Sequence, residues 1–258
     1  MMNRIEGKLA VITGATAGIG EACARHLARH GADLILLARR GERLDDLQHE
    51  LHTEFGVKVR TKVFDVRVRA QSEALHDELV EEGLSPDILI NNAGLARGLA
   101  AIHDGSPDDW DEMIDTNVKG LLYVTRAVLP RMVECNSGHV VNIGSIAGRW
   151  VYPMGNVYNA TKFAVYALSE GMNVDLAGTQ VRVTSIDPGA VETEFSKVRF
   201  HGDEDRAAST YQGYTPLTPD DVADSVCYAL NVPEHWYVHQ MMIMCTDQRG
   251  TVFHKTAD

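Results

Sequence analysis

The stretch "TGATAGIG", residues 13–20, follows an apolar run of strand length and opens a segment with a helical pattern. Its three glycines have the spacing G-x-x-x-G-x-G, which differs from the common G-x-G-x-x-G fingerprint. Glycines at such a turn let the backbone approach a pyrophosphate, and the N-terminus of the following helix attracts the same group. A purely structural turn is the alternative, but the strand before it and the helix after it favour a phosphate-binding loop. The residues expected in this loop are Gly14, Thr16, Ala17, Gly18, Ile19 and Gly20.

Apolar runs of strand length alternate with longer amphipathic segments along the chain. The predicted strands are residues 9–14, 33–38, 57–65, 87–94, 138–145, 181–189 and 241–245. The predicted helices are residues 18–30, 41–55, 70–83, 107–134, 155–178 and 219–230. Strands that are apolar on both faces belong in a parallel sheet covered by helices. The sequence therefore predicts an α/β fold, a single Rossmann-type domain over residues 1–258 with a doubly wound parallel sheet of about seven strands and helices on both faces.

One segment interrupts this alternation. Residues 192–216 lie between the sixth predicted strand and the next helix. A connection of this length in a compact domain is usually either a functional lid or a disordered segment. We expect a lid over the substrate.

The composition argues against several classes of protein. The chain has 258 residues, and its 24 Lys and Arg against 36 Asp and Glu give a net charge of −12. This balance disfavours non-specific binding to nucleic acid or to an anionic membrane. The four cysteines form no Cys-x-x-Cys pair, the first residues lack the apolar run of a signal peptide, and no run approaches a membrane span. We expect a cytoplasmic protein with no metal site and no nucleic-acid or membrane partner.

The end of the second predicted strand indicates which dinucleotide is bound. About 20 residues after the glycines, an NAD-binding unit normally offers Asp or Glu to the ribose hydroxyls. Here the neighbourhood holds Ala38, Arg39 and Arg40. Two guanidinium groups suit the 2′-phosphate of NADP, which arginine can bind bidentately. The alternative is a solvated basic start to a helix.

Polar residues also end the third and fourth predicted strands. Asp65 ends the third strand, and Asn91 and Asn92 lie toward the end of the fourth. The carboxyl ends of parallel strands are where open α/β sheets bind ligands, so these side chains are candidates for adenine and ribose contacts. Caps of ordinary loops are the alternative.

Ser145, Tyr158 and Lys162 form a candidate proton-transfer group. Ser145 ends the fifth predicted strand, and Tyr158 and Lys162 share a face of the following helix because they are four positions apart. Tyrosine, with an unperturbed pKa of about 10, is a poor acid–base group at neutral pH, but a nearby ammonium lowers that pKa. Tyr158 can then exchange a proton with a substrate oxygen, which the Ser145 hydroxyl also hydrogen-bonds.

These motifs, taken together and in this order, resemble those of the short-chain dehydrogenases/reductases over essentially the whole chain. The matching segments are "TGATAGIG", "NNAG", "MIDTNVKG", Ser145, "YNATK" and "DPG". The resemblance implies a catalytic tetrad of Asn117, Ser145, Tyr158 and Lys162, in which the lysine also holds the nicotinamide ribose and the asparagine supports a water-linked proton relay. Beyond the loop and the arginines, the residues expected at the NADP(H) site are Asp65, Val66, Asn92, Ala93, Gly94, Tyr158, Lys162, Pro188, Gly189, Val191 and Thr193.

Longer segments narrow the resemblance to one group. "NNAGLARG", "NIGSIAGRWVYPMGNVYNATK" and "EFSKVRFHGD" look like those of the NADP-dependent 3-hydroxy acid dehydrogenases, which include serine 3-dehydrogenases, and sulfoacetaldehyde reductases are similar. Their substrates carry an alcohol or carbonyl two bonds from a carboxylate or sulfonate, so the site should contain a cation. Arg149 and Arg199 are candidates to bind this anion, beside the contacts of Ser145 and Tyr158 with the reacting oxygen. An ordinary surface arginine is the alternative for each.

The predicted function is the NADP(H)-dependent interconversion of a small 3-hydroxy acid, such as serine or 3-hydroxypropionate, and its 3-oxo acid or semialdehyde. The expected partner is therefore a small anionic hydroxy acid or aldehyde. Three alternatives stay open: reduction of sulfoacetaldehyde to isethionate, reduction of neutral ketones or acyl thioesters, and NADP(H) binding by a regulator without turnover. The intact tetrad argues against the last.

Two predicted helices carry more apolar residues than one buried stripe needs, residues 107–134 and 155–178. The family resemblance implies a homotetramer or homodimer formed through such helices, and we predict a homotetramer. A monomeric mass in solution would contradict this expectation.

Overall fold

All seven predicted strands lie in one parallel sheet in the computed structural model, which describes residues 3–254. The strands are β1 (Leu9–Thr13), β2 (Asp33–Ala38), β3 (Val59–Val63), β4 (Ile88–Asn91), β5 (Gly138–Ile143), β6 (Val181–Pro188) and β7 (Gln240–Ile243). Their order is β3-β2-β1-β4-β5-β6-β7, and every neighbouring pair is parallel. The predicted doubly wound sheet is therefore confirmed. Residues 1–2 and 255–258 of the predicted domain lie outside the described residues.

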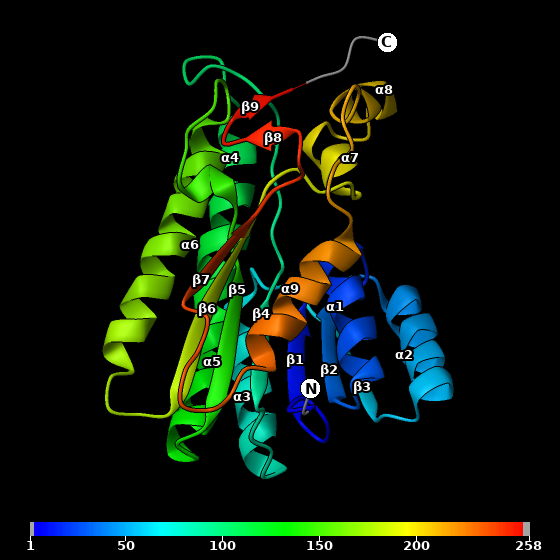
Figure 1. The fold of residues 1–258 in the computed structure, drawn as a ribbon, viewed down its shortest axis with the longest axis vertical. Coiled ribbons are helices and arrows are strands. Elements are labelled where there is room, and N and C mark those ends of the chain that lie inside the picture. The colour runs from blue at the N-terminus through cyan, green and yellow to red at the C-terminus, as the bar shows by residue number, and fades with distance from the viewer. Residues whose placement is uncertain (1–2, 255–258) are drawn as a thin grey trace.

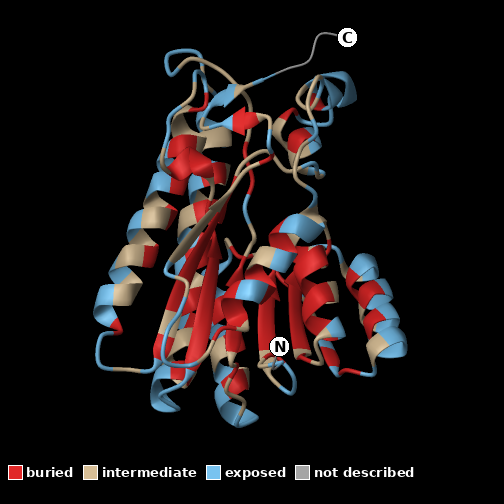
Figure 2. Cartoon of the chain, viewed as in Figure 1, coloured by how far each residue is buried: buried red, intermediate tan, exposed pale blue. Residues whose placement is uncertain are grey.

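Helices cover both faces of the sheet because successive strand residues point in opposite directions. In β1, Ala10 and Ile12 pack with helices α1 (Gly18–Arg29), α2 (Gly41–Phe55) and α9 (Pro219–Leu230). Val11, between them, packs with helices α3 (Arg69–Glu81) and α5 (Leu121–Glu134) and with the C-terminal part of α6 (Asn156–Asp175). The sheet is consequently buried from both sides, as the red strands of Figure 2 show.

The predicted helix over residues 107–134 is not uniform. It consists of α4 (Pro107–Ile114), a π-helical segment (Asp115–Gly120) and α5. Within the π segment, the side-chain amide of Asn117 hydrogen-bonds both the N–H and the C=O of Leu95, at 2.8 Å each. A π turn of this kind depends on a tertiary contact, which the hydrophobic period of the sequence does not encode.

Capping side chains define where α4 and α9 begin. Ser106 precedes α4, and its hydroxyl accepts a hydrogen bond from the N–H of Asp109. Thr218 precedes α9 and forms a reciprocal capping box with Asp221. Proline follows each cap, at the first helical position where its missing N–H has no intrahelical partner.

The segment 192–216 has secondary structure of its own, and its part as a lid over the substrate remains a prediction. It contains two short helices, α7 (Phe195–Arg199) and α8 (Glu204–Ser209). A small antiparallel pair follows near the C-terminus, β8 (Gln248–Arg249) and β9 (Val252–Phe253). Figure 1 shows these four elements together above the carboxyl ends of the parallel strands.

Several features of the described residues relate to the predicted cytoplasmic location and to the predicted assembly through helices. No helix within residues 3–254 is long and apolar enough to cross a membrane. The four cysteines are free, and three of them are buried. Exposed apolar side chains lie on α5 (Leu122 and Val133) and on α6 (Phe163 and Val174). Assembly through these helices and a cytoplasmic location remain predictions.

A buried histidine in β5 makes the stability of the fold depend on pH. The Nε2 of His139 lies 2.7 Å from the hydroxyl of Thr184, which itself donates to the carbonyl of Val238. Nε2 therefore carries the proton of the neutral ring. Burial, and to a smaller extent the charge of Arg182, lower the pKa of His139 from 6.5 to about 3. Between these two values the unfolded chain binds a proton that the folded chain does not, so the free energy of unfolding falls as pH falls from 6.5 toward 3.

We predict that His139→Gln flattens this dependence. Between pH 7.5 and 5, the wild-type protein should lose about 2 kcal/mol more of its unfolding free energy than the variant, from 1.36 kcal/mol per pH unit. Urea unfolding of both proteins at the two pH values measures the difference. Equal losses would show that His139 does not stay neutral in the folded state.

Candidate active site

The glycine turn between β1 and α1 has the geometry of an anion cradle. Gly14 and Gly18 have positive φ angles of 66° and 51°, which disfavour residues with a Cβ. At Gly20, a Cβ would overlap the carbonyl oxygen of Gly14, so this glycine allows close packing and lies outside the cavity lining. The amide of Asn92 donates to the carbonyl of Thr13 at 2.9 Å and thereby supports the turn.

A cavity of about 610 Å³ runs along the carboxyl ends of the strands. Twenty of the predicted site residues line it: Gly14, Thr16, Ala17, Gly18, Ile19, Arg39, Arg40, Asp65, Val66, Asn92, Ala93, Gly94, Ser145, Tyr158, Lys162, Pro188, Gly189, Val191, Thr193 and Arg199. The structure therefore brings together residues from nearly the whole length of the chain. Three predicted residues lie elsewhere: Gly20, Asn117 and Arg149.

Asn91 does not reach the cavity, in contrast to the prediction. Its side chain is buried and donates to Thr125 and Asn142, at 2.9 Å each. It therefore joins β4 to β5 and α5 and is not available to adenine or ribose. Its neighbour Asn92, which follows the strand, instead lines the cavity and supports the glycine turn.

Arginines gather where β2 leads into α2, at the start of the cavity. Arg40 donates to the carbonyl of Thr16 at 2.9 Å, which fixes its guanidinium against the glycine turn. Arg43, which was not among the predicted site residues, lies in the first turn of α2 and extends the basic group. Arg40 and Arg43 both pair with Glu194, whereas Arg39 makes no hydrogen bond or ion pair with another described residue. Arg39 and Arg40 line this end of the cavity and Arg43 lies next to Arg40, so the group offers cations suited to a phosphate.

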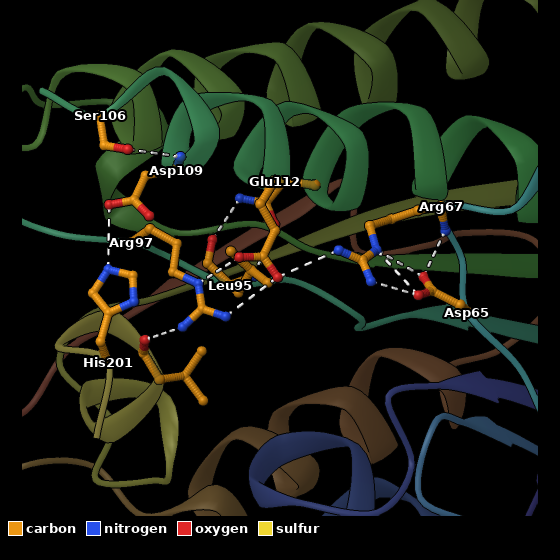
Figure 3. Close-up of polar contacts among 10 residues, drawn as sticks. Asp65, Arg67, Leu95, Arg97, Ser106, Asp109, Glu112 and His201 are labelled. Carbon is orange, nitrogen blue, oxygen red and sulfur yellow. Dashed lines mark hydrogen bonds and ion pairs between the residues drawn. The ribbon is translucent and has the colours of Figure 1, made fainter.

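Asp65 anchors a chain of ion pairs that reaches α7 (Figure 3). The carboxylate pairs with Arg67 at 2.6 Å, and this hydrogen-bonded cation holds the pKa of Asp65 below its usual range. Arg67 also contacts Glu112 at 3.4 Å, and Glu112 pairs with Arg97 at 2.6 Å. Arg97 in turn donates to the carbonyl of Val198 in α7.

A backbone hydrogen bond strengthens this attachment. The N–H of Gly98 donates to the carbonyl of Arg199 at 2.8 Å. His201 lies 3.3 Å from Asp109 of α4, as Figure 3 also shows. The segment after β4 and helix α4 thus hold α7 in place above the cavity.

Tyr158 and Ser145 lie together at the inner end of the cavity. Ser145 caps a 3₁₀ turn, and its hydroxyl accepts a hydrogen bond from the N–H of Ala147 at 3.1 Å. Burial raises the pKa of Tyr158, and Tyr152 raises it further, whereas Arg199 and a hydrogen bond with Ser145 lower it. Burial therefore favours the protonated hydroxyl of Tyr158, whereas the cation nearby favours its charged form.

Lys162 lies on the same face of α6 but differs from the expectation. Its ammonium group donates to the carbonyl of Ile143 at 2.9 Å and lies 6.0 Å from the ring centroid of Tyr158. Burial lowers the pKa of Lys162 to about 8, while Asp187 acts in the opposite direction. The expected lowering of the Tyr158 pKa by Lys162 is wrong: burial raises that pKa, and Arg199 is the cation that opposes the rise.

Arg199 lies among aromatic rings beside Tyr158. Its guanidinium carbon is 5.2 Å from the ring centroid of Tyr158, and 5.6 Å from those of Tyr152 and Phe195. One guanidinium nitrogen donates to the Tyr152 hydroxyl, and within residues 3–254 the buried Nε has no hydrogen-bond partner. Such a guanidinium keeps an N–H group that can donate to an anion, and the faces of the aromatic rings stabilise its positive charge.

Arg149 is not positioned as the sequence predicted. Its guanidinium stacks on the ring of Tyr166, 3.3 Å from the centroid, and its Nε lies 3.7 Å from the buried carboxylate of Asp187. The 3₁₀ turn after Ser145 directs it away from the cavity. We therefore withdraw Arg149 as a candidate for substrate binding.

Asn117 is buried beneath the cavity floor. Besides its two bonds to Leu95, its amide donates to the hydroxyl of Thr161 at 3.0 Å. A Cβ on Gly94 would lie 3.2 Å from the Asn117 side-chain oxygen and 3.8 Å from the Lys162 ammonium nitrogen. The side chain of Asn117 therefore supports the floor close to Lys162, and its predicted part in a proton relay remains a prediction.

Several lining residues gave no sequence signal. Tyr211 and Tyr214 come from the segment 192–216, and Gln248, Thr251 and Phe253 come from the C-terminal part of the chain. Gln248 is buried and accepts a hydrogen bond from the N–H of Ala190 at 2.9 Å, which fixes the chain next to Gly189. No motif marks these residues, because their position depends on how the segment 192–216 and the C-terminal segment fold over the sheet.

Comparison with known proteins agrees with this fold. A model of the short chain dehydrogenase family matches residues 8–204. The chain is 48% identical to an NADP-dependent 3-hydroxy acid dehydrogenase of Salmonella typhi, over 93% of this chain and 96% of the relative. It is 44% identical to sulfoacetaldehyde reductase 2 of Chromohalobacter salexigens, over 95% of this chain and 97% of the relative.

A solved structure is also similar to this protein over nearly the whole chain. The closed form of a serine dehydrogenase complexed with NADP+ superposes with a TM-score of 0.89 at 46% identity, covering 97% of this chain and all of the other. The fold and the site define a Rossmann-type oxidoreductase. The chain belongs to the short-chain dehydrogenase family.

Proposed function

We propose that this enzyme uses NADP(H) to interconvert a small 3-hydroxy acid and its 3-oxo acid or semialdehyde. The observation that carries the substrate class is the guanidinium of Arg199, 5.2 Å from the ring centroid of Tyr158. A cation beside the proton-transferring hydroxyl suits a substrate whose carboxylate is two bonds from the reacting carbon. Relatives named as 3-hydroxy acid and serine dehydrogenases support the same class.

The residues at the other end of the cavity fit NADP(H). The positive φ angles of Gly14 and Gly18 and the N-terminus of α1 suit the pyrophosphate. Arg39, Arg40 and Arg43 suit the 2′-phosphate. When bound, NADP(H) accepts or supplies the hydride, and the chain has to position the substrate and move a proton.

Tyr158 is the proposed general acid and base. In the oxidation direction it takes the proton from the substrate hydroxyl, and in reduction it returns a proton to the carbonyl oxygen. Ser145 lies within hydrogen-bonding reach of Tyr158 and orients the same substrate oxygen. Lys162, with a pKa of about 8, keeps positive charge at neutral pH below the tyrosine.

Arg199 is the proposed anchor for the carboxylate. Its buried Nε has no partner in the described part of the chain, and Tyr152 and Phe195 restrict where the guanidinium can move. A charge-assisted bond from this group holds the substrate with its hydroxyl toward Tyr158. The restriction also favours small substrates.

Reduction of sulfoacetaldehyde to isethionate is the second candidate. The observation that favours it is the 44% identity to a relative named sulfoacetaldehyde reductase. A sulfonate offers Arg199 the same acceptor oxygens as a carboxylate, so the cation alone does not separate the two.

Initial rates with four alcohols test the proposal. We predict that NADP+ is reduced with at least one of serine, 3-hydroxypropionate and 3-hydroxyisobutyrate, and more slowly when NAD+ replaces NADP+. Activity on isethionate alone would favour the second candidate. No activity on any of the four, with NADPH still bound, would contradict the substrate class and direct the search to neutral ketones and acyl thioesters.

We predict that Tyr158→Phe lowers kcat by about 10²–10⁴-fold, the usual contribution of a general acid–base group. The dissociation constant for NADPH, measured by its fluorescence, should stay close to that of the wild type, because only one hydroxyl is lost. Tyr166→Phe is a matched control on the same helix, since that ring lies against Arg149 and outside the cavity lining. Retained turnover in Tyr158→Phe would overturn the acid–base assignment.

A further inference from the structure

A carboxylate from the segment 192–216 pairs with two of the three arginines proposed to bind the 2′-phosphate. Glu194 pairs with Arg40 at 2.9 Å and with Arg43 at 3.0 Å, one carboxylate oxygen to each guanidinium. The three side chains are between 42% and 51% exposed, so solvent and a ligand can reach them. The hydrogen bond to Arg40, followed by that to Arg43, holds the pKa of Glu194 below its usual range.

The place of this cluster in the cavity is defined by other contacts. Arg40 is fixed to the glycine turn through the carbonyl and the hydroxyl of Thr16, at 2.9 and 3.3 Å. A Cβ on Gly18 would lie 3.0 Å from the side chain of Thr193, so the backbone next to Glu194 also lies close to this turn. Glu194 therefore reaches across the phosphate cradle from the start of α7 to the start of α2.

We propose that the Glu194 carboxylate takes the place of the 2′-phosphate on Arg40 and Arg43. It thereby sets the preference between NADP(H) and NAD(H). This inference rests on the proposed use of NADP(H). A phosphate and a carboxylate accept hydrogen bonds from the same guanidinium donors, and two anions at one site repel each other. The 2′-phosphate must therefore displace Glu194, whereas a dinucleotide that lacks this phosphate leaves the pairs intact.

The displacement also affects the segment above the substrate. Glu194 immediately precedes α7, which carries Arg199 at its other end. Pairing with Arg40 and Arg43 ties the start of α7 to α2, while Arg97 and Gly98 hold its end. Binding of the 2′-phosphate releases the first attachment and keeps the second.

Binding of two nucleotide fragments tests the proposal without turnover. The probes are 2′,5′-ADP, which carries the 2′-phosphate, and 5′-AMP, which lacks it, titrated by calorimetry at one ionic strength. We expect Glu194→Gln to bind 2′,5′-ADP about two- to fivefold more tightly than the wild type, since exposed ion pairs are worth at most about 1 kcal/mol. Binding of 5′-AMP should be unchanged.

Glu204→Gln is the matched control. Glu204 lies in α8 of the same segment, changes the net charge equally, and pairs with Lys197 instead of the arginines. It should bind both probes like the wild type. Equal gains in the two variants would show a general charge effect and overturn the proposal.

Two other binding results would contradict one of the proposals. Unchanged or weaker binding of 2′,5′-ADP by Glu194→Gln would show that Glu194 does not compete with the phosphate. If Glu194→Gln lowers the melting temperature of the protein, the titrations are repeated with Glu194→Ala. The same gain in affinity for 2′,5′-ADP is expected for that variant. A wild-type enzyme that binds 2′,5′-ADP no better than 5′-AMP would instead contradict the proposed use of NADP(H).

Discussion

The contact between the Arg199 guanidinium and the Tyr158 ring joins the two halves of the site. Tyr158 comes from a helix packed on the sheet, whereas Arg199 comes from the segment above it. The cation reaches this position because Arg97 and Gly98 hold the end of α7 by its carbonyl groups. In a site of low polarity such a charge acts more strongly than in water, both on the pKa of the tyrosine and on an anionic substrate.

Local sequence signals predict much of this arrangement. The glycine turn, the strand runs and the spacing of Ser145, Tyr158 and Lys162 carry their information within short stretches, and the structure brings these residues to one cavity. Glu194 and Gln248 show what such signals omit. The carboxylate of Glu194 lies 154 positions from Arg40, so the sequence next to the arginines contains no sign of it.

Spacing also misleads where a short turn redirects a side chain. Arg149 is only four residues from Ser145, but the 3₁₀ turn between them sends it to Tyr166 and Asp187. The four-residue spacing does bring Lys162 and Tyr158 to one face of α6, but it does not show that the ammonium group donates to the carbonyl of Ile143. In both cases a buried partner on another element decides the direction, and periodicity does not contain that partner.

The most direct test compares an anionic with a neutral alcohol in wild type and Arg199→Gln. The substrates are 3-hydroxypropionate and 1,3-propanediol, in which a hydroxymethyl group replaces the carboxylate. If Arg199 anchors the carboxylate, the ratio of kcat/KM for the acid to that for the diol should fall by about 10- to 100-fold in the variant, from the loss of a charged hydrogen bond. An unchanged ratio, even with lower rates for both alcohols, would contradict the account.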